Sequence, residues 1–268
     1  RLLGREDSRR ARRARSALDM LLLLGIVLTG AASSSLGLRP RPASRVYASA
    51  VGSTVGESPA FRLVALDDVS LERTSLTGVA AMFVDSWFWG TMSSEVQEQQ
   101  LVDEVAVDMR KRYSEQRTAD DSQLVVALGD YGEVWGCAGV ELLSMTVDGK
   151  LPSSWSERRG ARLRPHISNL AVSRARRRTG LGRALVRECE QIALAWKCPE
   201  MTLFVDHENE PAIALYETLG YRVVSSVQAD KPIPRKGQTR RLDPGYAFAW
   251  VPCANVFLVR DLPQGLEE

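Results

Sequence analysis

Apolar positions between residues 61 and 260 alternate between strand-like and helix-like spacing, and this pattern predicts an α+β fold. Short runs rich in apolar and β-branched residues predict strands. They cover residues 61–66, 123–128, 133–145, 166–172, 201–205, 221–225 and 255–259. Apolar residues three to four positions apart predict helices over residues 76–89, 93–117, 181–197 and 211–219. The turn at residues 129–132 predicts a hairpin between two of the strands.

Two polar stretches interrupt this pattern, at residues 147–165 and 226–245. Residues 151–165 hold four Arg against one Glu, and residues 228–244 hold five basic against two acidic side chains. Because they lack an apolar period and contain several prolines, we expect both to be surface insertions in a single domain, residues 59–268.

Residues 1–58 have the composition of a presequence. Residues 1–19 precede the first Met, residues 20–32 form an apolar core of signal-peptide length, and residues 33–58 are rich in Ser and Arg, with no acid before Glu57. A signal core followed by a transit-like segment predicts a bipartite address to the stroma of a plastid bounded by extra membranes. Secretion, or one continuous mitochondrial or plastid presequence, is the alternative. After removal of this segment we expect no stable membrane association.

Charge and cysteine content exclude several classes of function for this chain of 268 residues. Residues 1–50 carry ten Arg against three acids, so the remaining chain has 25 basic and 30 acidic residues. A mildly acidic body argues against nucleic-acid binding, including by the arginines near residue 176, which have no aromatic residues between them. The four cysteines show no metal-binding spacing, so we expect no metal.

A basic glycine turn follows the predicted strand that ends at residue 172. Gly180 and Gly182 stand at the start of a predicted helix, where several backbone N–H groups have no partner within the helix. Together with the helix dipole, these groups form an anion site suited to a pyrophosphate. The Rossmann and Walker patterns are both absent.

A second motif lies about thirty residues further on. Asn209 predicts the cap of a short helix that ends before Gly220, and Tyr216 stands beside its apolar face. Arg177-Arg178-Thr179-Gly180-Leu181-Gly182, followed by Asn209, Ala212, Leu215, Tyr216, Gly220 and Tyr221, resembles the two ordered motifs of the GNAT superfamily of N-acetyltransferases. The flanking sequence is most similar to plastid GNAT enzymes that acetylate protein N-termini and lysines.

The resemblance implies a single GNAT-type domain. Its mixed sheet would have about six to seven strands, splayed between the two central ones, and about four helices. The activity implied is that of an acyltransferase acting on amino groups (EC 2.3.1), with acetyl-CoA as the co-substrate. The implied donor site comprises Leu170, Ala171, Val172, Arg177, Arg178, Thr179, Gly180, Leu181, Gly182, Arg183 and Asn209.

The resemblance also implies direct transfer of the acetyl group to an amine. Tyr216 is the candidate acid for the leaving thiolate, and His166 is a tentative base, because imidazole takes up protons near neutral pH. Glu141, Asp206 and a water relay stay open as alternatives. We expect a protein N-terminus or a lysine as acceptor, since two long insertions border the groove. A small-molecule acetyltransferase and a non-catalytic acyl-CoA-binding module are the rival interpretations.

Overall fold

The computed structural model describes residues 46–47, 61–66, 76–88, 95–115, 121–152, 159–234 and 248–263. They form one sheet flanked by helices. The strands are β1 (Val46–Tyr47), β2 (Arg62–Leu66), β3 (Ser122–Leu128), β4 (Val134–Met145), β5 (Arg162–Val172), β6 (Glu200–Asp206), β7 (Arg222–Pro234) and β8 (Phe248–Asp261). The α-helices are α3 (Leu76–Phe88), α4 (Glu95–Arg110), α6 (Leu181–Ala195) and α7 (Glu210–Thr218). A π-turn, η1 (Lys111–Glu115), and a 3-10 turn, η2 (Arg174–Arg176), complete the order.

The sheet is mixed, with the order β1-β2-β3-β4-β5-β6-β8-β7. Every neighbouring pair is antiparallel except β5 and β6, which are parallel and joined through α6. The single α+β domain predicted from the sequence is therefore confirmed. It has seven main strands and, within the described residues, four α-helices; the two-residue β1 adds to the predicted strand count.

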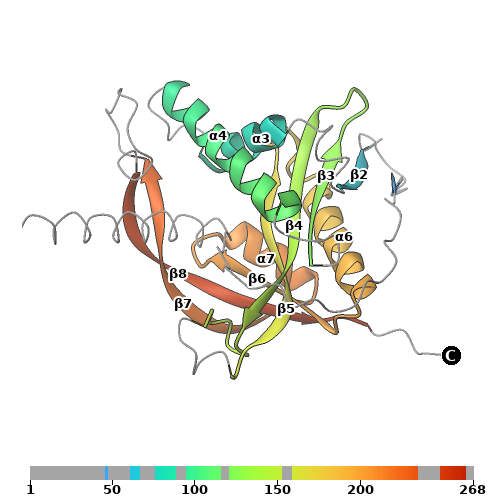
Figure 1. Ribbon diagram of the computed structural model, residues 1–268, viewed down its shortest axis with the longest axis vertical. Helices are drawn as coiled ribbons and strands as arrows, with labels where there is room; N and C mark the ends of the chain where they lie inside the picture. Colours follow the sequence, from blue (N-terminus) through green and yellow to red (C-terminus); the bar gives the residue numbers. More distant parts are fainter. Residues whose placement is uncertain are drawn as a thin grey trace, which may run out of the picture.

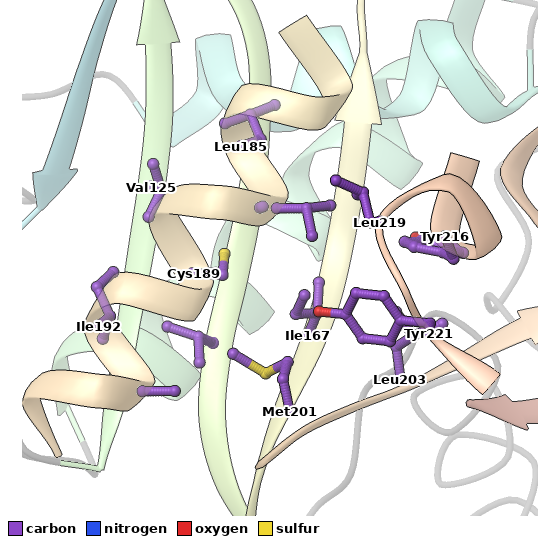
Figure 2. Close-up of a cluster of buried hydrophobic side chains, with 14 of the residues drawn as sticks. Val125, Ile167, Leu185, Cys189, Ile192, Met201, Leu203, Tyr216, Leu219 and Tyr221 are labelled. Atoms are coloured by element: carbon purple, nitrogen blue, oxygen red, sulfur yellow. The ribbon is translucent and has the colours of Figure 1, made fainter. Parts of the chain in front are cut away.

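Helices cover both faces of the sheet (Figure 1). On one face, α3 and α4 bury a stripe against β3 and β4 that includes Val79, Phe83, Val105 and Met109. On the other face, α6 and α7 close a second core, shown in Figure 2, where Leu185 and Cys189 of α6 meet strand residues such as Leu203. Cys189 is thus a core residue, as its spacing predicts.

The structure corrects several details of the predicted pattern. Val96 is 53% exposed although the spacing assigns it to the buried stripe of α4, because that stripe begins only at Leu101. The insertion predicted over residues 226–245 is partly strand: β7 continues to Pro234 and pairs with β8, so the predicted final strand also begins earlier. Prolines at residues 232 and 234 are compatible with this, since β7 is an edge strand.

The proposed division of residues 1–58 lies outside the described residues, apart from the short β1 at residues 46–47. Among the helices that the structure describes, none is both long enough and apolar enough to cross a membrane.

Candidate active site

The two central strands diverge at their carboxyl ends. β5 and β6 are paired only at His166↔Thr202 and Ile167↔Leu203, although β5 runs on to Val172 and β6 to Asp206. Beyond Ile167 the edge of β5 therefore has no ladder partner on the β6 side. In a parallel sheet, the crevice outside the carboxyl ends of strands is where ligands bind. The splay predicted from the sequence is present.

An irregularity in β5 accompanies this divergence. The register with β4 shifts between Cys137↔Ala171 and Gly139↔Ser168, so β5 has an extra residue here. Asn169 in this bulge has φ of 52°, in the left-handed region that Asn tolerates better than most residues. A bulge of this kind bends its strand and re-aims the side chains next to it. We attribute the turn of β5 away from β6 to this bulge.

The glycine turn stands just beyond the end of β5. Gly180 is the residue before the first turn of α6, with φ of 87°, and a Cβ at Gly180 would meet no atom within 4 Å. The space beside Gly180, at the start of α6 where the first backbone N–H groups have no partner within the helix, is therefore open. Arg178, exposed and also in the left-handed region with φ of 65°, makes no hydrogen bond or ion pair with the described residues. These features fit the predicted anion site.

Other side chains of the predicted donor site have neighbours within the protein. Arg177 donates from Nη2 to the carbonyl oxygen of Ser86 at 2.7 Å and from Nε to that of Val172 at 3.4 Å. Arg183 donates to the Thr218 hydroxyl at 3.2 Å and so links α6 to α7. Arg177 therefore braces the turn against α3, a role that its position in the motif does not reveal.

The remaining predicted donor residues hold the turn and the two helices in place. The Thr179 hydroxyl donates to the carbonyl of Arg176 at 2.7 Å, and Leu181 is buried in the core. A Cβ on Gly182 would lie 3.4 Å from Leu215 of α7, so this glycine permits close packing of the two helices. Asn209 caps α7 by accepting a hydrogen bond from the backbone N–H of Ala212. Leu170, Ala171 and Val172 form the end of β5, opposite the unpaired part of β6.

Tyr216 lies on α7 and is 5% exposed, and its ring lies edge-on to that of Tyr221, with 5.7 Å between the ring centroids (Figure 2). Its hydroxyl has no hydrogen-bond partner among the described residues. Burial, and to a lesser extent the nearby Cys189 thiol, raise the pKa of Tyr216 above its usual value of 10. The phenol therefore keeps its proton at neutral pH, as a general acid must.

His166, the tentative base, is buried in the interior of the domain and only 1% exposed. The Thr202 hydroxyl donates to the carbonyl of Pro165 at 2.8 Å, so His166 Nδ1 donates to Thr202 at 3.1 Å. Burial, helped by the positive charges of Arg112 and Arg164, lowers the pKa of His166 to about 3. An imidazole this weakly basic is a poor proton acceptor, and its surroundings argue against the role.

The other candidate bases differ in their surroundings. Asp206 ends β6, where its carboxylate accepts from the backbone N–H of Glu208 at 3.1 Å. Glu141 lies opposite His166 on β4, fully buried, and forms an ion pair with Arg112. The Ser168 hydroxyl donates to Glu141 Oε1 at 2.9 Å. Sequence reasoning missed Ser168 and Arg112, because nothing in their local pattern shows that α4, β4 and β5 bring them together.

Within the residues that the structure describes, no group of three or more His, Cys, Asp or Glu is arranged to hold a metal ion.

A comparison with protein families supports the motif assignment. The model of the acetyltransferase (GNAT) family matches residues 81–221, more than half of the chain. The chain belongs to this family. The matched stretch runs from α3 to Tyr221, so it includes the splay, the glycine turn and Tyr216. The chain is therefore an acetyltransferase by family.

Solved structures of other acetyltransferases are similar to the chain at low identity. Nourseothricin acetyltransferase is 21% identical over 53% of this chain and 66% of that one, with a TM-score of 0.35. NAA60 of Arabidopsis thaliana, solved with acetyl-CoA, is 16% identical over 75% and 98%, with a TM-score of 0.44. The PaiA N-acetyltransferase of Thermoplasma acidophilum, solved with coenzyme A, is 15% identical over 75% and 99%, with a TM-score of 0.43. No curated protein matches the chain.

Proposed function

We propose that this protein transfers the acetyl group of acetyl-CoA directly to an amine of a polypeptide. The observation that carries the proposal is the splay between β5 and β6, which opens next to the Gly180 turn and Tyr216. A pantetheine amide needs backbone partners, which the unpaired edge of β5 beyond Ile167 offers. The pyrophosphate needs an anion site, which the start of α6 and Arg178 offer.

The reaction requires three proton transfers besides the attack on the thioester, two from the acceptor and one to the leaving group. An acceptor that arrives as an ammonium loses one proton before attack and a second as the amide forms. The leaving thiolate gains a proton, for which the buried Tyr216 phenol is the proposed donor. One proton is released for each acetyl group transferred, and the phenol regains its own from solvent.

The β7–β8 hairpin is the main argument for a polypeptide acceptor. β6 ends at Asp206, paired with Asn255, whereas β7 and β8 continue for seven more pairs, from Gln228↔Ala254 to Pro234↔Phe248. At about 3.4 Å per residue, this extension projects roughly 20 Å past the end at which β5 and β6 diverge. Figure 1 shows the hairpin running beyond β6. A hairpin extension of this length suits an extended polypeptide acceptor better than a small amine.

The start of the first predicted insertion contacts the base of this hairpin. The Ser225 hydroxyl of β7 donates to the carbonyl of Asp148 at 2.5 Å, and Gly149 packs on Phe257 of β8 without room for a Cβ. The basic character of the first insertion is smaller than its composition indicates. Arg162 and Arg164 lie in β5 and both pair with Glu200. The hairpin, more than the charge, therefore supports the polypeptide acceptor.

The acceptor proposal is tested by competition between amines. We would compare kcat/KM for peptides with a free α-amine, N-terminally blocked peptides with one lysine, and spermidine. A peptide should be preferred by at least tenfold. Preference for spermidine or another small amine by that factor would replace this proposal with a small-molecule acetyltransferase.

A shortened hairpin gives a second test of the same proposal. Removing residues 229–253 and closing the strands with a two-residue turn leaves the pairs with β6 intact. This variant should lose peptide acetylation while retaining transfer to glycinamide, which is too short to reach the hairpin. Equal losses for the two acceptors would contradict the role of the hairpin.

We also propose that the protein acts in a plastid. The support is the composition of residues 1–58, with a signal-length apolar core before an acid-poor segment rich in Ser and Arg. Mitochondrial and secretory destinations are the alternatives for the import experiment described below.

A further inference from the structure

A cluster of buried polar side chains lies between β4, β5 and the end of α4. It comprises Arg112, Tyr113, Glu141, Ser168 and Asn169, none more than 6% exposed. Such groups are costly to bury, and here Glu141 Oε2 and Asn169 Oδ1 have no hydrogen-bond partner among the described residues. A hydrophobic cluster would stabilise the domain at less cost, so the polar composition calls for another explanation.

The hydrogen bonds of the cluster have a defined direction. Ser168 donates its only hydroxyl proton to Glu141 Oε1 at 2.9 Å. The Tyr113 hydroxyl, 3.1 Å from Ser168 Oγ, must therefore be the donor to Ser168, and it accepts in turn from Asn169 Nδ2 at 3.1 Å. A hydroxyl oxygen accepts two hydrogen bonds, and Tyr113 supplies one. Ser168 Oγ thus retains one lone pair for a further donor.

Gly139 fixes the position of the Tyr113 hydroxyl. A Cβ at Gly139 would overlap this hydroxyl, which therefore rests directly on the backbone of β4. Gly139 pairs with Ser168 across the strands, next to the bulge. The chain of hydrogen bonds therefore lies directly against the backbone of β4 next to the bulge.

Ser168 is also the first residue of β5 beyond the last pair with β6, Ile167↔Leu203. It therefore stands where the splay begins, with the buried Glu141 behind it. The backbone of Ser168 thus lies at the start of the splay, and its buried hydroxyl connects this point to the Glu141 carboxylate through one hydrogen bond.

The charges of the cluster favour the uptake of one proton. Arg112 forms an ion pair with Glu141, and its Nη1 lies 3.9 Å from Asp108 Oδ2 on the preceding turn. Two carboxylates and one guanidinium carry a net charge of −1 when both acids are ionised, so protonation neutralises a buried charge. Consistently, burial above all raises the pKa of Asp108 to about 6. The other titratable or charged groups nearby are Lys111 and Tyr113 of η1 and His166 and Arg164 of β5.

We propose that Ser168 and Glu141 form the path by which the acceptor ammonium loses its proton, with Arg112 and Asp108 setting the charge of the site. The ammonium N–H donates to the free lone pair of Ser168 Oγ. As that proton transfers to Ser168, the hydroxyl proton of Ser168 passes to Glu141 Oε1. The serine is unchanged, Glu141 becomes a neutral carboxylic acid, and the free amine attacks the thioester. This inference rests on the acetyl transfer proposed above.

The test compares Ser168→Ala with Ser122→Ala, two buried serines attached to the same cluster. Ser122 donates only to the backbone carbonyl of Arg112, away from the splay. For a peptide α-amine at pH 7, Ser168→Ala should lower kcat/KM by about 10²-fold, a typical contribution of proton transfer, and Ser122→Ala by less than about threefold. Ser168→Thr, which keeps the hydroxyl, should restore most of the activity.

Two further measurements separate proton removal from a packing effect. The loss in Ser168→Ala should shrink above about pH 8, where an α-amine loses its proton to solvent. It should also be small for a peptide whose first residue is azaglycine, because its terminal nitrogen is then a hydrazide NH2 that is uncharged at neutral pH. Glu141→Gln should show the same pattern. An equal loss for amine and hydrazide at every pH would overturn the proposal.

Failure of the proposed function gives a different result. If the wild-type protein binds acetyl-CoA in calorimetry but acetylates neither acceptor, the acetyl transfer itself is wrong. If the wild-type protein acetylates both acceptors and Ser168→Ala, folded and with unchanged acetyl-CoA affinity, keeps the wild-type pH profile, only the proton path is wrong.

Discussion

The guanidinium of Arg177 is hydrogen-bonded to the carbonyl oxygen of Ser86, with 2.7 Å between Nη2 and O. This contact joins the turn after β5 to the end of α3, and the ion pair of Arg174 with Asp85 at 3.1 Å reinforces it. Since Arg177 is engaged, we expect the donor phosphates to bind to the backbone N–H groups of α6 and to Arg178. The glycine at the start of α6 is therefore the most direct point at which to test the donor site.

Gly180→Glu should weaken acetyl-CoA binding by at least tenfold. The new side chain would enter the open space in front of the first N–H groups of α6 and bring a negative charge to the anion site. The positive φ of 87° adds strain of about 1–2 kcal/mol in the folded state. Calorimetric titration with acetyl-CoA measures the affinity, and chemical unfolding measures the stability.

Gly132→Glu is the matched control for this variant. Gly132 has φ of 83° and open space around it, but lies in the turn between β3 and β4. It should lose a similar free energy of unfolding without any change in acetyl-CoA affinity. Unchanged affinity in a folded Gly180→Glu protein would remove the phosphate assignment.

Tyr216→Phe should lower kcat by about 10²-fold at saturating substrates, while acetyl-CoA affinity and stability change little. The reason is that its hydroxyl has no partner among the described residues, so packing alone holds the ring. Tyr221→Phe should behave in the opposite way. The Tyr221 hydroxyl donates to Glu190 Oε1 at 3.1 Å, so its removal should cost about 1–2 kcal/mol of stability with kcat retained. If both variants kept wild-type turnover, Tyr216 would not be the acid.

His166 should make the folded state less stable in acid. Its pKa is about 3 when folded, against an ordinary 6.5, so between these values the unfolded chain binds a proton that the folded chain does not. The contribution of His166 is fully present above pH 6.5 and is lost as the pH falls towards 3, by up to ~1.4 kcal/mol per pH unit. His166→Asn should remove this dependence.

Urea unfolding of wild type and His166→Asn at pH 7, 5.5 and 4.5 gives the comparison. Asp108, whose pKa is raised when folded, acts in the opposite direction, and taking the difference between the two proteins cancels its effect. Parallel stability curves would show that His166 does not titrate as described, and a kcat/KM step near pH 6.5 lost in His166→Asn would reinstate it as the base.

Residues 20–57 should direct a fluorescent protein to a plastid bounded by extra membranes. A fusion that starts after Ala32 lacks the apolar core, and so should fail to enter the secretory route and remain outside the organelle. Microscopy in an alga with secondary plastids provides the measurement. Import that does not depend on residues 21–32 would favour a simple transit peptide.

Much of the fold follows from local pattern. The order of strands and helices, the hairpin of β3 and β4, and the caps of α7 at Asn209 and Gly220 all depend on residues close in sequence. The extension of β7 to Pro234 could not be predicted in this way, because prolines and charges in that stretch have the composition of a loop. Its strand conformation depends on pairing with β8, which local pattern does not report.

The candidate site was predictable to a similar extent. Gly180 and Tyr216 are identified by motif, since the conformations they need are set within a few residues. The burial of His166 and the contacts of Glu141 with Arg112 and Ser168 depend on how three distant segments pack. In the sequence Glu141 is one acidic residue among many, and only the folded sheet shows which groups form an ion pair or hydrogen bond with it.

The short parallel ladder between β5 and β6 also has a mechanical consequence. Among the described residues, two residue pairs form the whole ladder that joins the strands from β1 to β5 to the strands β6, β8 and β7. With so few cross-links, the two sub-sheets should exchange their amide hydrogens as separate cooperative blocks. A donor molecule bound in the splay would contact both sub-sheets. Its binding should therefore slow amide hydrogen exchange in both of them.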